Sequence, residues 1–166
     1  MGYRSDVALK FARTDLEEDP VNSRDPDGLK VRYMRYKNEM NHRSLIMEEH
    51  ITTSLIDEPE EGSLPLPVGL LSLLQNELGA EMYLEGMYVT ALITYVKWYD
   101  DTYPSIQAVM SLLASLDNQE LYEYYGYCRF GEELGDQAQE GLIDAAPYVS
   151  RHIILDLPKD HEVVNY

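Results

Sequence analysis

Carboxylates are the side chains in this sequence whose placement could support chemistry. Asp100 and Asp101 lie one residue beyond one predicted strand, and Glu132 and Glu133 lie one residue beyond another. If these two strands run parallel through a right-handed crossover, their carboxyl ends lie at the same edge of the sheet, and the four acids gather there. Such a cluster could hold Mg²⁺ or Ca²⁺, which prefer oxygen ligands, or it could present negative charge to a basic partner.

Motifs for other chemistries are missing from the sequence. It contains no EF-hand loop, G-x-S-x-G motif, Walker loop or G-x-G-x-x-G motif, and its four histidines lack metal-site spacing. The single cysteine, Cys128, excludes an intrachain disulfide, and we expect it to be buried in a strand. We therefore predict no catalytic residue, no metal and no cofactor, and a protein that is not an enzyme. A small metal-dependent hydrolase that uses the clustered carboxylates is the alternative.

The charge of the chain is unusual and unevenly distributed. The net charge is −17, with a balance of +1 over residues 1–43 and −18 over residues 44–166. An acidic surface repels nucleic acid and anionic membranes and attracts basic protein surfaces. We therefore expect a basic protein as the partner, with no direct contact to nucleic acid or membrane. An acidic surface that only keeps the protein in solution is the alternative.

Periodicity along the chain predicts the elements that position these acids. Alternating or β-branched residues predict strands, and apolar residues on one helical face predict helices. We predict a single α+β domain over residues 1–166, with a four-stranded mixed sheet and helices packed mainly on one face. Proline and acidic residues mark a projecting linker or insertion at 52–68, and a polar tail occupies 157–166. The predicted strands are 3–11, 88–98, 124–130 and 148–155, and the predicted helices are 29–51, 70–78 and 104–116.

The helix predicted at 29–51 is the basic segment of the chain. Apolar residues recur along it at helical spacing, and bases surround them between Lys30 and Arg43. Residues 29–37 alternate well enough that a strand is the alternative there. If the basic helix faces outward, it could dock on an acidic patch of a second copy, so an oligomeric structural protein is another alternative.

Tyrosine is abundant near the predicted acidic edge. The chain has fourteen tyrosines and two phenylalanines, and eleven of the tyrosines lie from Tyr83 onward. Tyrosine is enriched at binding interfaces, although it also fills cores from which its hydroxyl can reach a polar partner. We predict that acids of the edge and of the linker bind the partner together with two tyrosines: Asp57, Glu58, Glu60, Glu61, Tyr99, Asp100, Asp101, Tyr103, Glu132, Glu133 and Asp136.

Four segments resemble a family of small proteins from tailed bacteriophages and prophages. These are the opening MGYRSDVAL, VKWYDDTYPSIQA at 96–108, YYGYCRFGEE at 124–133 and YVSRHI at 148–153. Members of the family pair an MGYRS strand with a later KWY…YP…QA strand-to-helix junction and a Y-G-x-x-R-x-G-E-E strand. The resemblance covers the strand core, and residues 14–86 depart from the family pattern.

The resemblance implies a phage origin and residence in the cytoplasm of an infected bacterium, but no set of catalytic residues. By analogy with other small acidic phage proteins, carboxylates spaced like phosphates can take over lysine and arginine contacts otherwise made to DNA. We therefore expect an accessory protein that binds and inhibits or modulates a basic, nucleic-acid-binding host protein. DNA mimicry in counter-defence is the mode of action that this analogy suggests.

Overall fold

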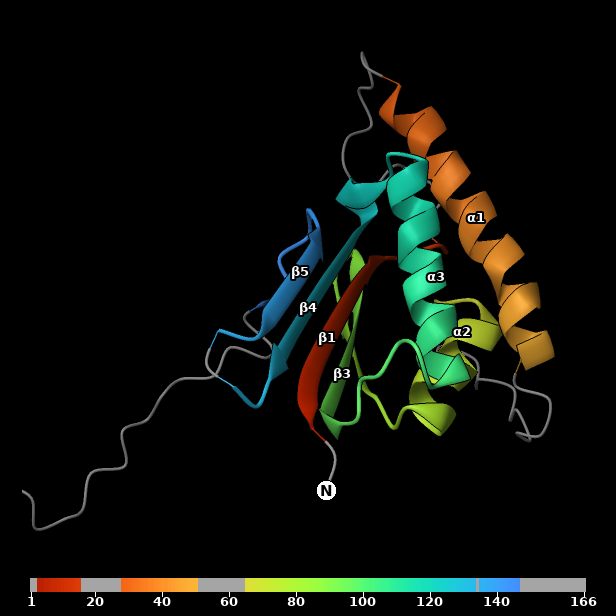
Figure 1. The fold of residues 1–166 in the computed structure, drawn as a ribbon. Helices are drawn as coiled ribbons and strands as arrows, with labels where there is room; N and C mark the ends of the chain where they lie inside the picture. Colours follow the sequence, from red (N-terminus) through yellow and green to blue (C-terminus); the bar gives the residue numbers. More distant parts are fainter. Residues whose placement is uncertain (1–2, 16–27, 51–64, 134, 147–166) are drawn as a thin grey trace, which may run out of the picture.

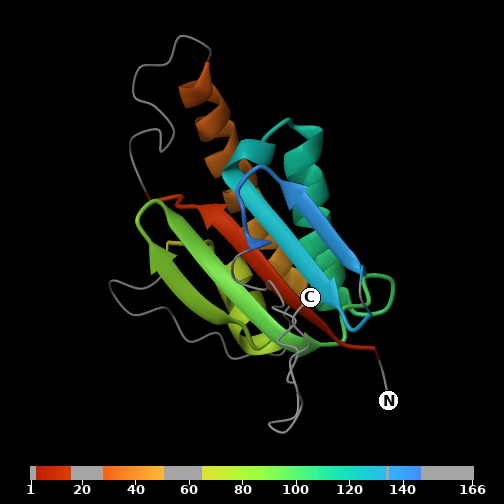
Figure 2. The ribbon, with the colours of Figure 1, turned by 90° about the vertical axis from the view of Figure 1, so that its left-hand side faces the viewer.

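The computed structural model describes residues 3–15, 28–50, 65–133 and 135–146, with the side chains of α1 described up to Met47. Its elements form an α+β fold in which one sheet carries helices on one face (Figures 1 and 2). In chain order they are β1 (Ser5–Ala12), α1 (Leu29–His50), α2 (Val68–Ser72), the π-helical turn η1 (Leu73–Glu77), β2 (Glu81–Glu85), β3 (Tyr88–Val96), α3 (Pro104–Asn118), the 3₁₀ turn η2 (Tyr122–Tyr124), β4 (Tyr125–Gly131) and β5 (Gln137–Gly141).

The sheet is antiparallel throughout its described strands, in the order β2-β3-β1-β4-β5. β1 lies at its centre, and Val7, Leu9 and Phe11 face the helices while Ala8 and Lys10 face the other side. β1 is central because its apolar alternation can be buried against a neighbour on each edge.

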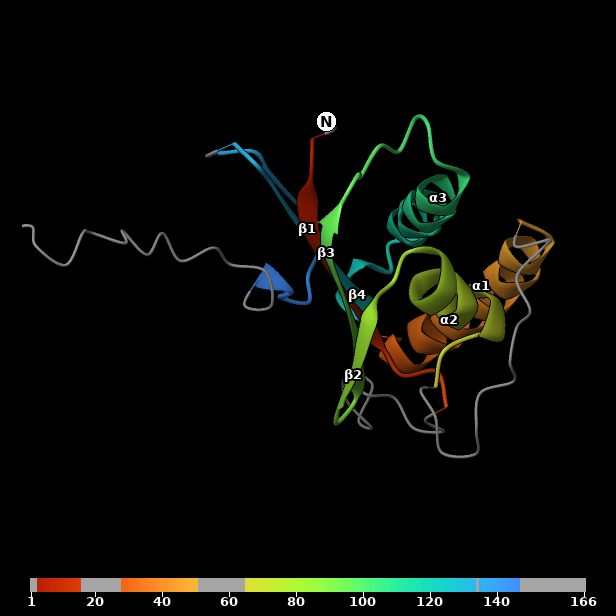
Figure 3. The ribbon, with the colours of Figure 1, turned by 90° about the horizontal axis from the view of Figure 1, so that it is seen from below.

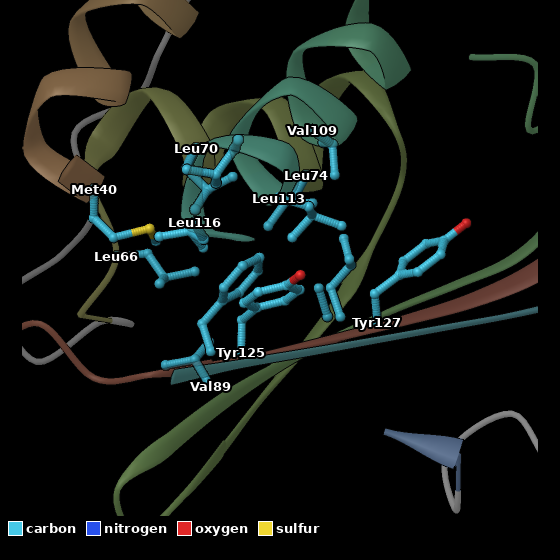
Figure 4. Close-up of a cluster of buried hydrophobic side chains, with 14 of the residues drawn as sticks. Met40, Leu66, Leu70, Leu74, Val89, Val109, Leu113, Leu116, Tyr125 and Tyr127 are labelled. Carbon is cyan, nitrogen blue, oxygen red and sulfur yellow. The ribbon is translucent and has the colours of Figure 1, made fainter. Parts of the chain in front are cut away.

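The core lies between the sheet and the helix layer. Seen from below, α1, α2 and α3 all lie on the same side of the sheet (Figure 3). Leucines of α2, η1 and α3 interlock with aromatic and aliphatic side chains of β3 and β4, as Figure 4 shows around Leu113 and Tyr125. α3 starts at Pro104, as predicted, because a proline at the first helical turn has no amide hydrogen to leave unpaired.

Three tyrosines tie α1 to the sheet. The rings of Tyr33 and Tyr36 of α1 stack on each other with their centroids 5.9 Å apart. The Tyr124 ring stacks on Tyr36 at 5.1 Å and lies tilted against Tyr33 at 5.5 Å. The Tyr36 hydroxyl donates to the Ala12 carbonyl at 2.9 Å, and the Tyr124 hydroxyl donates to the Leu29 carbonyl at 3.1 Å. These tyrosines therefore act as core residues with a polar tip, and the helix predicted for this segment is confirmed over the strand alternative.

Two predictions about the sheet are wrong. The sheet is not mixed, and β2 and β5 extend it beyond the predicted strands to five strands in the described part of the chain. Both added strands lie at sheet edges. β2 joins β3 through a two-residue hairpin that contains the left-handed Gly86, and the longer connection from β4 to β5 contains the left-handed Gly135. Edge strands bury little: Met82 is the one half-buried residue of EMYLE, and QAQEG has no buried residue and is mostly polar, so neither segment gives a strong strand signal.

Two predicted regions lie outside the described residues. These are the strand at 148–155 with the tail after it, and most of the linker at 52–68. None of the described helices combines the length and the apolar composition that crossing a bilayer requires.

Candidate functional site

The turns that carry the predicted acids lie at one end of the sheet. Ser5, the first residue of β1, pairs with Val96 at the end of β3 and with Gly131 at the end of β4. β3 and β4 therefore run in the same direction on either side of β1, and both end beside the start of β1 (Figure 1). We call this end of the sheet the rim, and define it as residues 3–6, 95–103, 131–133 and 135–136.

Tyr3 joins the two turns of the rim. Its hydroxyl donates to Asp136 Oδ2 at 2.5 Å and accepts from the Glu133 amide at 3.0 Å. Its carbonyl oxygen accepts from the Tyr99 hydroxyl at 3.2 Å. The hydrogen bond to Asp136 is the main reason why the pKa of Tyr3 is raised. The structure thus holds the turn after β3 and the turn after β4 against the same residue.

Asp136 is engaged within the rim. Arg129 donates to both of its carboxylate oxygens, at 2.9 and 3.1 Å, and Tyr3 donates a further hydrogen bond. These donors, Arg129 first, lower the pKa of Asp136 to about 2. Gly131 leaves room for these contacts, because a Cβ there would lie 1.9 Å from Asp136 Oδ2 and 2.3 Å from the Tyr3 hydroxyl and would displace these side chains. Asp136, predicted to bind a partner, therefore has an evident role in holding the rim together.

The other predicted acids of the rim are exposed. Glu132 accepts from the Arg4 amide at 2.6 Å, and both Glu132 and Glu133 reach solvent. Asp100 and Asp101 are exposed in the turn that leads into α3.

Two tyrosines frame that turn. Tyr99 and Tyr103 stack with their ring centroids 5.9 Å apart, and the Tyr103 amide donates to the Tyr99 carbonyl at 3.1 Å. Tyr103 stays exposed, whereas Tyr99 is half-buried. The rim therefore presents the four predicted acids and Tyr103 to solvent.

Tyr95 is a rim residue that the sequence did not single out. Between the pairs Val7–Ile93 and Ser5–Val96, β3 has one residue more than β1, which is a β-bulge opposite Asp6. Tyr95 lies in this bulge with φ +54°, a left-handed conformation that glycine adopts at little cost and tyrosine does not. Its side chain is 71% exposed.

Two neighbours hold Tyr95 in place. Its amide donates to Asp6 Oδ1 at 2.8 Å, and the Arg4 guanidinium lies 5.0 Å from its ring centroid. Glu120 is the other non-glycine residue with positive φ in the described chain, and its position just after α3 explains it, since helices commonly end on a left-handed residue. No such helix end explains Tyr95. The local sequence VTALITYVKW gives no sign of the bulge.

The remaining predictions concern metals, the linker and Cys128. In residues 3–15, 28–50, 65–133 and 135–146, no three or more His, Cys, Asp or Glu side chains are grouped so that they could hold a metal ion. Asp57, Glu58, Glu60 and Glu61 lie outside the described residues. Cys128 is buried, as predicted, and burial raises the pKa of its thiol. Comparison of the chain with protein-family models, with curated proteins and with solved structures found no match.

Proposed function

We propose that this chain is a non-enzymatic accessory protein that binds a basic, nucleic-acid-binding protein through the rim. In this proposal the chain is encoded by a phage and acts in the cytoplasm of the infected bacterium. It inhibits or modulates its target by occupying the surface that the target otherwise uses for DNA.

The conformation of Tyr95 is the observation that carries the proposal. A positive φ at a tyrosine lowers the stability of the folded state. Burial of the Tyr95 side chain compensates for little of this loss, because most of the side chain is exposed. Bulges of this kind re-aim a side chain and are frequent beside functional sites. A large, exposed aromatic side chain held by Arg4 and Asp6 is suited to anchor an interface.

The charge of the rim supports a basic target. Its basic side chains are Arg4 and Lys97, and its acidic side chains are Asp6, Asp100, Asp101, Glu132, Glu133 and Asp136. Asp136 is paired with Arg129 of β4, which leaves an excess of negative charge on the exposed turns. Exposed acids on both turns can approach lysines and arginines that would otherwise contact DNA phosphates. Electrostatic complementarity of this kind speeds association and selects the partner.

A charge-reversal experiment tests the proposal. The chain is immobilised and incubated with bacterial lysate as the wild type, as Asp100→Lys/Asp101→Lys and as a control, Glu85→Lys/Glu120→Lys. Glu85 and Glu120 are exposed near the opposite end of the sheet, so the control changes net charge equally and leaves the rim intact. Bound proteins are identified by mass spectrometry, and folding of each variant is checked by circular dichroism.

We expect wild type and control to retain the same basic, nucleic-acid-binding protein and the rim variant to lose it. Retention should also fail in about 1 M salt, where the Debye length is about 3 Å. Equal retention by all three proteins would refute a role for the rim, and retention that is insensitive to salt would refute the electrostatic basis of binding.

A further inference from the structure

α1 has two faces with apolar side chains, and α2, α3 and the sheet pack against only one of them. The inner face buries Tyr33, Tyr36 and Met40. On the outer face, Val31 and Leu45 are each 65% exposed, and Met34 is 47% exposed. These residues, with Asn38 and Asn41 between them, are spaced by three and four residues in alternation, which is the spacing of a coiled-coil seam. We call Val31, Met34, Asn38, Asn41 and Leu45 the outer seam.

The outer seam is flanked by basic side chains. At 100° per residue, Lys30 and Lys37 lie along one side of it, and Arg35 lies along the other. Lys37 also interacts with Asp15. The acid of this stretch, Glu39, points toward the domain, where Arg43 donates to it at 2.9 Å and Ser115 donates a further hydrogen bond. α1 lies at the outer margin of the helix layer (Figures 1 and 3). No other element of the described chain covers the seam.

We propose that the outer seam binds an amphipathic helix of a partner protein whose flanking residues are acidic. Apolar residues of the partner would pack against Val31, Met34 and Leu45, and its acids would pair with the basic flanks. Asn38 and Asn41 would favour one register, because a polar residue within a seam disfavours apolar pairings that bury it. A second copy of this chain fits less well, since pairing two α1 helices brings like-charged flanks together.

This inference goes beyond the proposed function and does not depend on it. The seam runs along the helix layer, whereas the rim lies at the end of the sheet where β3 and β4 finish. A helix bound at the seam would leave the rim accessible. The chain would then be an adaptor with a basic apolar site for one partner and an acidic site for another.

Two synthetic peptides test the seam. Both span about three heptads with leucine at the seam positions, and they differ only in carrying glutamate or lysine at the flanking positions. Binding of each labelled peptide to the full chain is measured by fluorescence anisotropy at low salt. We expect the glutamate peptide to bind at least about tenfold more tightly than the lysine peptide, because several flanking charges act together.

A matched pair of variants ties that binding to α1. The substitutions Val31→Glu/Leu45→Glu should weaken binding of the glutamate peptide by at least about tenfold. Ser111→Glu/Ala114→Glu, on the exposed face of α3, should leave binding unchanged. Helical circular dichroism confirms that both variants fold.

Three results would overturn the inference. The first is equal binding of the two peptides, and the second is undiminished binding by the Val31/Leu45 variant. The third is a light-scattering result in which the wild type is a dimer and the Val31/Leu45 variant is a monomer. That result would show that the outer seam binds a second copy of this chain.

Discussion

Replacing Tyr95 with glycine separates the strain of the bulge from the role of the side chain. At an ordinary position, glycine is about 0.5–1 kcal/mol less stable than alanine because the unfolded chain gains more freedom. At φ +54° the order should reverse, since a left-handed conformation costs a residue with a Cβ about 1–2 kcal/mol. We therefore expect Tyr95→Gly to be more stable than Tyr95→Ala.

Relative to wild type, Tyr95→Gly should change stability little. Tyr95→Gly gains about 1–2 kcal/mol from the relieved backbone. It loses about 0.5–1 kcal/mol in chain entropy and about 0.5–1 kcal/mol from the contact with Arg4. The net change in the free energy of unfolding should lie within about 1 kcal/mol of zero, a shift of no more than about 4 °C in Tm for a chain of this size.

Urea unfolding of wild type, Tyr95→Gly and Tyr95→Ala measures these differences directly. A control, Tyr122→Gly, removes an exposed tyrosine at the other end of β4, where no positive φ is relieved, and should destabilise by about 1 kcal/mol. Binding to the captured target should fall about thirtyfold for Tyr95→Gly, equivalent to about 2 kcal/mol, and stay unchanged for the control. If Tyr95→Ala is as stable as Tyr95→Gly, or if Tyr95→Gly binds normally, the argument from strain to function fails.

Three further predictions concern the scaffold. Gly126→Ala should destabilise by about 1–3 kcal/mol or more in urea unfolding, because its Cβ would lie 1.9 Å from the Ile143 carbonyl oxygen; unchanged stability would contradict this packing. The pKa of Asp136 is about 2, compared with an ordinary value of 3.8, because Arg129 donates to its carboxylate. This ion pair therefore stabilises the fold fully above pH 3.8, and the stabilisation is lost as the pH falls from 3.8 toward 2. Asp136→Asn should therefore have a lower Tm than wild type at pH 7, and the gap should close in thermal scans between about pH 4 and pH 2; a constant gap would argue against the ion pair. Cys128 is buried, so it should react with a thiol reagent many times faster in urea than in buffer. Fast labelling of the native protein would contradict burial of the Cys128 thiol in β4.

Local patterns of apolar residues predicted the helices and strands that bury one whole face of their side chains. The helical stripe of α3 and the alternation of β1 each reflect burial of their own side chains, so the sequence alone indicates them. The pairing of these elements depends on partners far apart in the chain. β1 lies between β3 and β4, and no local signal shows this insertion, so the sheet was predicted as mixed. The edge strands β2 and β5 were missed because they bury little.

The rim was predicted in outline and missed in detail. The predicted ends of β3 and β4 located the acids at one end of the sheet. The structure agrees, because both strands run in the same direction and end beside the start of β1. Asp136 and Tyr3 are 133 positions apart, and nothing in either segment predicts their hydrogen bond. Tyr95 was missed because its bulge arises from the register with β1, which only the folded sheet defines.

Competition with DNA tests the central claim most directly. The target captured by the wild type is titrated with labelled duplex DNA in the presence of increasing amounts of the chain, at several salt concentrations. We expect the wild type and the Glu85→Lys/Glu120→Lys control to displace the DNA, the Asp100→Lys/Asp101→Lys variant to fail, and displacement by the wild type to weaken as salt rises. A ternary complex in which target, DNA and chain remain bound together would contradict occupation of the DNA-binding surface by the rim.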